Sequence, residues 1–313
     1  MSYTELRIDV TDSLPAEITQ GQRLSIAVWL FVPDVKKLGR KPTIISLLNG
    51  GSYDKRYFHC VIPGREGYST AEHLCALGNI VVLPDHLGIS DSSRAVDQKK
   101  ITREIAALAN HAAMTEIYAR LQKGTLHPLL PPISEFLKVG GGHSMGGMQT
   151  ITQQAHYQTF DRICVLGYTA IGVHLTFNGQ VVSADPGPLN DADPDYWLLD
   201  RSGVHESFHW GDVPADVIAY DDTLLVEVPN VLSKQSITTG IVSADAGRID
   251  VPVYICLGER DVSPQPHAEP SYYKSSRDVT LHILPKSGHC QSFASTRKIM
   301  FDRIDAWIRS IPA

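Results

Sequence analysis

The first candidate for chemistry is a serine with a glycine two residues away on each side, in the sequence Gly142-His143-Ser144-Met145-Gly146. The pattern Gly-x-Ser-x-Gly is typical of a nucleophilic serine on a sharp turn between a strand and a helix. Larger residues at the two glycine positions would clash across such a turn. The first turn of the following helix offers free N–H groups to developing negative charge. We therefore predict that Ser144 is a nucleophile.

A serine hydroxyl needs a base to take its proton, and a histidine oriented by a carboxylate serves that purpose. In the chain order serine, acid, histidine, both partners follow the serine and each comes just after a strand. The apolar runs 251–257 and 279–284 are followed closely by Asp261 and His289. We predict that His289 is the base and that Asp261 orients it. Glu259 is a rival for the acid, but the spacing after the strand favours Asp261.

Other polar residues near these patterns are predicted to have structural roles. His143 adjoins the serine, but a neighbouring side chain on such a turn points away from the serine oxygen, so we predict that it packs. His282 lies inside an apolar run and is predicted to be a hydrogen-bonded structural histidine.

A second pattern points to different chemistry. Residues 205–209, His-Glu-Ser-Phe-His, fit the zinc-peptidase motif His-Glu-x-x-His, in which both histidines lie on one face of a helix. Glu227 would be a candidate third ligand. Gly203 lies just before the motif, and a stretch ending in Pro214 follows it at once, which disfavours a continuous helix. We therefore predict no metal site and expect these residues to line a lid.

The elements that must position these residues alternate along the chain. Apolar runs that indicate strands lie at 43–48, 80–83, 136–139, 163–166, 251–257 and 279–284, and helical patterns lie at 99–121, 145–156 and 292–308. Continuous apolar runs suit strands buried on both faces of a parallel sheet. Runs near 5–10 and 23–33 have no helix between them, which indicates an antiparallel edge. We predict an α/β fold with a mainly parallel eight-stranded sheet and helices on both faces.

Residues 173–249 interrupt this alternation. The stretch is too long for an ordinary connection and contains several aromatic residues. We predict an inserted lid over the carboxyl edge of the sheet, between the sixth and seventh core strands, with residues 1–172 and 250–313 forming the core. The aromatic residues need something apolar to cover, so substrate contacts are predicted for Trp197, Phe208 and Trp210. A surface excursion without function is the alternative.

Five pieces of the sequence, in order, resemble the α/β-hydrolase superfamily. They are Asn49-Gly50-Gly51, Asp85-His86-Leu87-Gly88-Ile89-Ser90, Gly142-His143-Ser144-Met145-Gly146, Gly258-Glu259-Arg260-Asp261 and Gly288-His289. The resemblance implies the same nucleophile, base and acid, and for Asp85 it implies a role in organising its loop rather than in catalysis. It also implies an oxyanion hole formed by the backbone N–H groups of Gly51 and Met145. Asn49-Gly50 stands where many relatives have His-Gly.

Composition narrows the class of protein. The chain has 313 residues, of which 43% are hydrophobic and 20% charged, as in ordinary globular proteins. The net charge of −6 argues against a nucleic-acid-binding protein, which is expected to show a basic excess. No apolar run approaches the ~18 residues that span a bilayer. We therefore expect no nucleic-acid partner and no membrane span.

Cysteine usage and missing motifs suggest a location and exclude cofactors. Five scattered cysteines and a polar start without a signal pattern predict reduced, mostly buried thiols in a cytoplasmic protein. Neither glycine-rich nucleotide-binding pattern stands at a strand-to-helix turn, so we predict no cofactor. Nothing in the sequence indicates an oligomeric state.

The prediction for function is a serine hydrolase that cleaves a carboxylic ester or lactone of an apolar small molecule through an acyl-enzyme. Hydrolysis of an amide, a thioester or a carbon–carbon bond by the same triad is the alternative, and acyl transfer to an alcohol is a further one. A small-ligand binder without turnover is expected to have a damaged triad, and this triad is intact. Substrate identity depends on the shape of the pocket.

Overall fold

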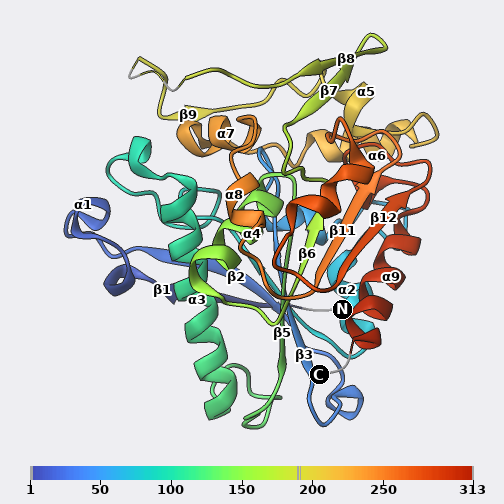
Figure 1. The fold of residues 1–313 in the computed structure, drawn as a ribbon. Helices are drawn as coiled ribbons and strands as arrows, with labels where there is room; N and C mark the ends of the chain where they lie inside the picture. The colour runs from blue at the N-terminus through green and yellow to red at the C-terminus, as the bar shows by residue number, and fades with distance from the viewer. Residues whose placement is uncertain (1–2, 189, 191, 312–313) are drawn as a thin grey trace.

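A computed structural model describes residues 3–188, 190 and 192–311. The strands of its main sheet are β1 (Thr4–Asp9), β2 (Ser25–Phe31), β3 (Thr43–Leu48), β4 (Ile80–Pro84), β5 (Leu137–His143), β6 (Arg162–Leu166), β11 (Val253–Gly258) and β12 (Val279–Leu284). Within the described residues the sheet has eight strands in the order β1-β2-β4-β3-β5-β6-β11-β12 (Figure 1). β2 pairs antiparallel with β1 and β4, and the other neighbours are parallel. The predicted mainly parallel sheet with an antiparallel edge is confirmed.

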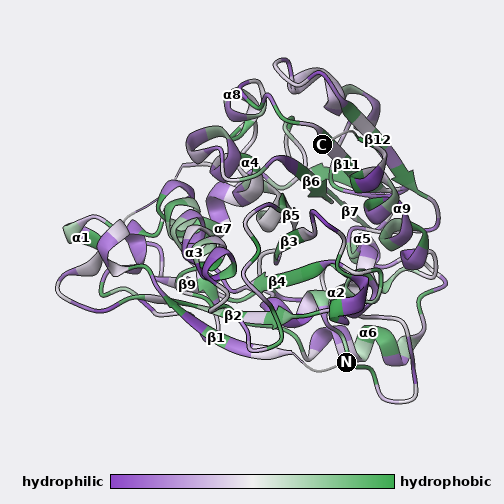
Figure 2. Cartoon of the chain, turned by 90° about the horizontal axis from the view of Figure 1, so that it is seen from below, coloured by the Kyte–Doolittle hydropathy of each residue, from purple (hydrophilic) through white to green (hydrophobic). Residues whose placement is uncertain are grey.

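Helices cover both faces of this sheet, as predicted. On one face α3 (Arg103–Lys123) packs against α4 (Met145–Tyr157) and against β1 and β2. On the other face α2 (Thr70–Ala76) and α9 (Arg297–Ser310) pack against each other and against strands. Figure 2 shows the central strand β4 in green, the hydrophobic end of the scale, while the surrounding helices carry purple stretches. The buried apolar side chains form two clusters, one on each face of the sheet.

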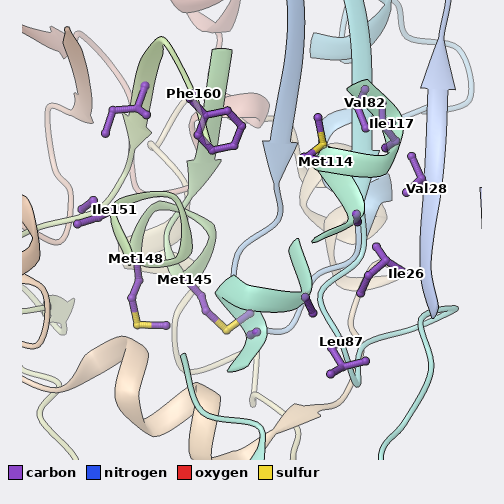
Figure 3. Packing of buried hydrophobic residues seen from close by; sticks show 14 of the residues in the cluster. Ile26, Val28, Val82, Leu87, Met114, Ile117, Met145, Met148, Ile151 and Phe160 are labelled. Carbon is purple, nitrogen blue, oxygen red and sulfur yellow. The ribbon is translucent and has the colours of Figure 1, made fainter. Parts of the chain in front are cut away.

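The continuous apolar runs are explained by these two clusters. In β4, Ile80 and Val82 belong to the apolar cluster on the α3 and α4 face, whereas Val81 and Leu83 belong to the cluster on the α2 and α9 face. Successive strand residues point to opposite faces, so a strand covered on both faces is apolar along most of its length. Figure 3 shows the first cluster, in which Met145 and Met148 of α4 accompany Met114 and Ile117 of α3.

Two helices begin later than the sequence pattern predicts. α3 begins at Arg103 rather than at residue 99, because a 3-10 turn precedes it and the Thr102 hydroxyl caps its first turn. α9 begins at Arg297 rather than at residue 292. Residues 291–293 form a separate 3-10 turn, in which the Gln291 side chain is hydrogen-bonded to the end of β11. The apolar spacing continues through these turns and hides the breaks.

Short elements complete the described chain. They are α1 (Ala16–Thr19) and the 3-10 turns η1 (Thr11–Ser13), η2 (Val35–Lys37), η3 (Lys55–Phe58), η4 (Gln98–Lys100), η5 (Pro266–Tyr272) and η6 (Gln291–Phe293). All five cysteines are buried and free, as predicted. Among the described residues, no helix combines the length and apolarity that crossing a membrane requires.

Residues 173–249, called here the 173–249 segment, add no strand to the main sheet within their described part. They form the hairpin β7 (His174–Phe177) and β8 (Gln180–Ser183), the pair β9 (Tyr196–Trp197) and β10 (Val228–Pro229), and the helices α5 (His205–Phe208), α6 (Ala215–Asp222), α7 (Asn230–Ile237) and α8 (Ser243–Ala246). α7 and α8 pack against α4. In Figure 1 the hairpin, β9 and α7 lie together at the top of the molecule.

Candidate active site

Ser144 lies on a strained turn between β5 and α4. Its backbone angles are φ 54° and ψ −121°, a conformation that side-chain-bearing residues rarely adopt. A Cβ at Gly142 would lie 2.2 Å from the carbonyl oxygen of Gly146, and a Cβ at Gly146 would lie 2.0 Å from the carbonyl oxygen of Leu48. Glycine is therefore required at both positions, and the turn presents the half-buried serine to the cavity described below.

His289 and Asp261 form a buried hydrogen-bonded pair. The distance from Nδ1 of His289 to Oδ1 of Asp261 is 2.7 Å, and the two side chains are 5% and 2% exposed. The carboxylate also accepts hydrogen bonds from the N–H groups of Gly258 and Val262, both at 2.7 Å, and from the Gln291 amide at 3.0 Å. Because a carboxylate only accepts hydrogen bonds, Nδ1 donates and Nε2 is left as the basic nitrogen.

Glu259, the alternative acid, points elsewhere. It is exposed and accepts a hydrogen bond from the backbone N–H of Lys286 at 2.9 Å. His143 stacks on Tyr57, with ring centroids 4.5 Å apart, and its Nε2 donates to the carbonyl of His289 at 2.8 Å. Burial holds the pKa of His143 well below its usual value, so the ring is neutral. It lies beneath the site and supports the backbone of His289.

The remaining structural predictions are also accounted for by contacts. His282 hydrogen-bonds to the Tyr254 hydroxyl at 2.7 Å, and burial lowers the pKa of this histidine to about 4. The fully buried Asp85 accepts the backbone N–H of Lys55 at 2.8 Å and pairs with the Lys55 ammonium at 2.5 Å. Asp85 therefore fixes the start of η3, as expected for a residue that organises its loop.

Gly51 lies opposite the first residue of α4. A Cβ on Gly51 would come within 3.9 Å of the Met145 side chain. The loop is fixed by Asn49, whose side-chain amide donates to the carbonyls of Gly50 at 3.2 Å and Tyr53 at 2.5 Å. The N–H of Met145 starts a helix and therefore has no acceptor within it. Both predicted oxyanion donors thus belong to backbone that borders Ser144.

A cavity of about 110 Å³ joins Ser144 and His289 to the 173–249 segment. Its walls are mostly apolar and include Val173, Leu175, Ala184, Trp197, Leu199, Val204, Phe208, Ile237 and Val262, with Gly51, Ser52, Ser233 and Ser236 as further lining. The Phe208 ring lies 5.2 Å from the His289 ring. Trp210 does not line the cavity and instead packs against the Arg260 guanidinium at 5.2 Å. The structure thus brings Trp197 and Phe208 to the cavity and leaves Trp210 outside it.

The zinc-peptidase pattern is not gathered into one ligand set. α5 is only one turn long, and His205 at its start and His209 just after its end contact different carboxylates. His205 hydrogen-bonds to Asp222 at 2.9 Å, and Nε2 of His209 lies 3.1 Å from Asp221. Across residues 3–188, 190 and 192–311, no group of three or more His, Cys, Asp or Glu side chains is arranged to hold a metal ion.

Sequence reasoning missed several contacts around the site. The carbonyls of Ser207 and Phe208 accept the backbone N–H groups of His289 and Cys290, both at 2.9 Å. A Cβ at Gly288 would lie 2.7 Å from the Phe208 carbonyl, so this close approach needs a glycine. These backbone contacts leave no residue pattern in the sequence. The 173–249 segment is therefore bonded directly to the loop that carries His289.

A model of the alpha/beta hydrolase family matches residues 47–297, more than half of the chain. The chain therefore belongs to the alpha/beta hydrolase family, in agreement with the resemblance seen in the sequence. A comparison with curated proteins gives no match.

Solved structures resemble the chain at low sequence identity. A thermophilic esterase from Thermogutta terrifontis is 14% identical with a TM-score of 0.60, and the match covers 97% of this chain and 98% of that one. A bromoperoxidase from Bacillus anthracis is 12% identical with a TM-score of 0.64, covering 98% and 100%. The N-acyl homoserine lactonase AidH is 14% identical with a TM-score of 0.60, covering 98% and 97%. At these identities the likeness concerns the fold.

Proposed function

We propose that the protein is a serine hydrolase that cleaves a carboxylic ester or lactone of a small apolar molecule. The observation that carries this proposal is the buried 2.7 Å hydrogen bond between Asp261 and His289, beside a cavity that Ser144 also lines. A histidine oriented in this way is a base for a serine hydroxyl. The esterase and lactonase folds among the similar structures support the same class of reaction.

The reaction proceeds through an acyl-enzyme. Oγ of Ser144 attacks the substrate carbonyl while Nε2 of His289 takes the hydroxyl proton, and Asp261 stabilises the resulting imidazolium. The N–H groups of Met145 and Gly51 stabilise the oxyanion of the tetrahedral intermediate. His289 then protonates the departing alkoxide. In the second half of the reaction His289 deprotonates a water molecule, which attacks the acyl-enzyme. The bond between the acyl carbon and Oγ of Ser144 breaks, Oγ takes the proton back from His289, and the acid is released.

The cavity supports a compact, apolar substrate. Its volume of about 110 Å³ is below the roughly 300–1,000 Å³ that is common for ligand pockets. Aliphatic and aromatic side chains of the 173–249 segment form much of its wall, so a charged group would lose hydration there without a partner. We propose that this segment is a cap that shapes the cavity and that Trp197 and Phe208 contact the substrate.

Hydrolysis of p-nitrophenyl esters from acetate to decanoate, by the wild type and by Ser144→Ala, tests the proposal. We expect the wild type to prefer short acyl chains and Ser144→Ala to lose about 10⁶-fold in kcat, because the nucleophile is gone. Folding of the variant is checked by circular dichroism and its Tm. Equal activity of the two proteins would remove Ser144 from the mechanism and overturn the proposal.

A further inference from the structure

Arg201 is buried between the 173–249 segment and the core. Its side chain is only 5% exposed. Nη1 donates to the Tyr53 hydroxyl at 2.5 Å and to Oδ2 of Asp221 at 2.9 Å, and Nη2 donates to the Ser52 carbonyl at 3.3 Å. The guanidinium also lies over the Tyr53 ring, 4.0 Å from its centroid. One planar cation thus connects three acceptors, two of which belong to the loop that contains Gly51.

The first connection fixes the loop of the proposed oxyanion hole. The Ser52 carbonyl accepts from Arg201 and also from the backbone N–H of Val226 at 3.1 Å, so both of its donors belong to the 173–249 segment. Ser52 has a φ of 62°, in the left-handed region that non-glycine residues seldom occupy. Gly51 directly precedes Ser52 in the chain. A rotation of the Ser52 backbone would therefore also displace the Gly51 N–H.

The second connection reaches the loop of His289. The Tyr53 hydroxyl lies 3.1 Å from Sγ of Cys290, the residue after His289. Burial raises the pKa of Tyr53 well above its usual value, so the hydroxyl stays protonated. It donates a hydrogen bond to Asp221 at 3.1 Å. The Cys290 thiol, whose pKa is also raised by burial, stays protonated and donates to the Tyr53 oxygen. The contacts therefore continue without a break from the guanidinium to the residue beside the catalytic base.

We propose that Arg201 is a positioning residue that fixes the Gly51 loop and the His289 loop relative to Ser144. This inference rests on the proposed function, because it concerns the same oxyanion hole and base. On this view the 173–249 segment completes the active site in addition to covering it. A displacement of about 1 Å in such groups lowers turnover roughly 100-fold, and complete loss of an oxyanion donor lowers it about 100- to 1,000-fold.

The informative variant is Arg201→Lys. Lysine keeps a positive charge for Asp221, which is fully buried, but a single ammonium on a flexible stem cannot replace the planar fork that reaches three acceptors. We expect kcat for a short p-nitrophenyl ester to fall about 10- to 100-fold. KM should change less than about threefold, because Arg201 is not among the residues that line the cavity.

A second variant covers the case in which Arg201→Lys does not fold. Arg201→Met combined with Asp221→Asn removes both buried charges, so neither is left unpaired in the interior. The side-chain volumes stay similar, and replacing a buried ion pair in this way is often neutral for stability. The fork to Ser52 and Tyr53 is still lost, so we expect the same 10- to 100-fold fall in kcat.

Arg65→Lys is the matched control. Arg65 makes a two-pronged ion pair with Asp216 at 2.6 and 2.7 Å, which likewise joins a core loop to α6. This pair is exposed, and neither residue lines the cavity. We expect kcat and KM within about twofold of the wild type, because exposed ion pairs contribute little. If kcat falls in Arg201→Lys but not in Arg65→Lys, the fall is due to the Arg201 contacts and not to the loss of any one contact between the core and the 173–249 segment.

The readout is the rate of inactivation by diethyl p-nitrophenyl phosphate, with the labelled residue identified by mass spectrometry. In this reaction a Ser144 Oγ–P bond forms, p-nitrophenolate leaves and His289 takes the serine proton, so the oxyanion donors and the base are both needed. We expect label on Ser144 in the wild type. We expect a 10- to 100-fold slower rate in Arg201→Lys, in parallel with kcat.

Two results would overturn the inference, and they are distinguishable. Wild-type-like labelling of a folded Arg201→Lys, or of the double variant, would show that the residue affects stability only. Absence of label on Ser144 in the wild type would defeat the proposed function itself and this inference with it.

Discussion

The central sheet and the 173–249 segment contribute to the same site in different ways. The sheet supplies Ser144, Asp261 and His289 at the ends of β5, β11 and β12. Plain apolar runs precede Asp261 and His289 in the sequence, whereas the glycine pattern marks Ser144. The segment contributes buried contacts from short elements without a repeating pattern, Arg201 foremost. Candidate catalytic residues that follow strands can be predicted from a sequence. The contacts that hold them in place join residues that are far apart along the chain.

The largest expected effect beyond loss of the nucleophile concerns the sheet. Asp261→Asn should lower kcat by about 10⁴-fold with little change in fold, because the amide N–H₂ would face Nδ1 of His289 and favour the tautomer with its proton on Nε2. Steady-state kinetics on a short p-nitrophenyl ester measure this. Glu259→Gln is the control, since its exposed side chain accepts the Lys286 N–H and is not bonded to His289 in the described structure, and it should retain activity within about twofold. A larger loss of kcat in Glu259→Gln than in Asp261→Asn would mean that Glu259, and not Asp261, orients His289.

The pH dependence of stability tests how His86, which follows β4, supports the loop of Gly51. His86 is fully buried, donates from Nε2 to the Asn49 carbonyl at 2.9 Å, and has a pKa lowered by burial to about 4. Between about pH 6.5 and pH 4 the unfolded chain binds this proton and the folded chain does not, so stability falls as the pH falls through that window. We expect this histidine to contribute about 3 kcal/mol to the fall.

Denaturant unfolding at several pH values measures that slope. In His86→Gln the neutral side chain can still donate to Asn49, so its free energy of unfolding should depend less on pH over the same window. His127→Gln is the control, because its ring accepts a hydrogen bond from the Leu129 N–H of its own loop at 3.1 Å. An unchanged slope in His86→Gln would mean that this histidine is not held neutral in the fold.

The smallest expected effect concerns the segment. Trp197 lines the cavity but is 38% exposed, so Trp197→Ala should raise KM about three- to tenfold, most for the longer acyl chains, and leave kcat nearly unchanged. Trp210→Ala is the matched control, because Trp210 packs on Arg260 outside the cavity. Equal changes in both variants would mean that the cavity wall at Trp197 does not recognise substrate. The chain-length profile of KM measures the difference.

The sequence was informative where function depends on neighbours along the chain. The glycines around Ser144 and the apolar runs before Asp261 and His289 are local patterns. The mainly parallel sheet with helices on both faces followed from the alternation of strands and helices, whereas the order of the strands in the sheet was not predicted. The start of α9 at Arg297 was missed because the apolar spacing runs on through η6.

Contacts between residues far apart along the chain could not be predicted from sequence patterns. Tyr53, Arg201, Asp221 and Cys290 meet only after folding, and no period or motif relates them. Trp210 could not be separated from the cavity-lining Phe208 either, because α5 ends at Phe208 and the chain direction then changes. Their placement depends on tertiary packing of one short helix.

The proposed mechanism requires an acyl-enzyme on Ser144. Its most direct test is rapid acid quenching of the protein a few milliseconds after mixing with p-nitrophenyl acetate, followed by peptide mass spectrometry. We predict an acetyl group on Ser144 alone, formed together with a burst of p-nitrophenolate, and no acetyl group at this position when His289 is changed to alanine. Turnover without a burst and without acetylated Ser144, or acetylation at another residue, would contradict the account.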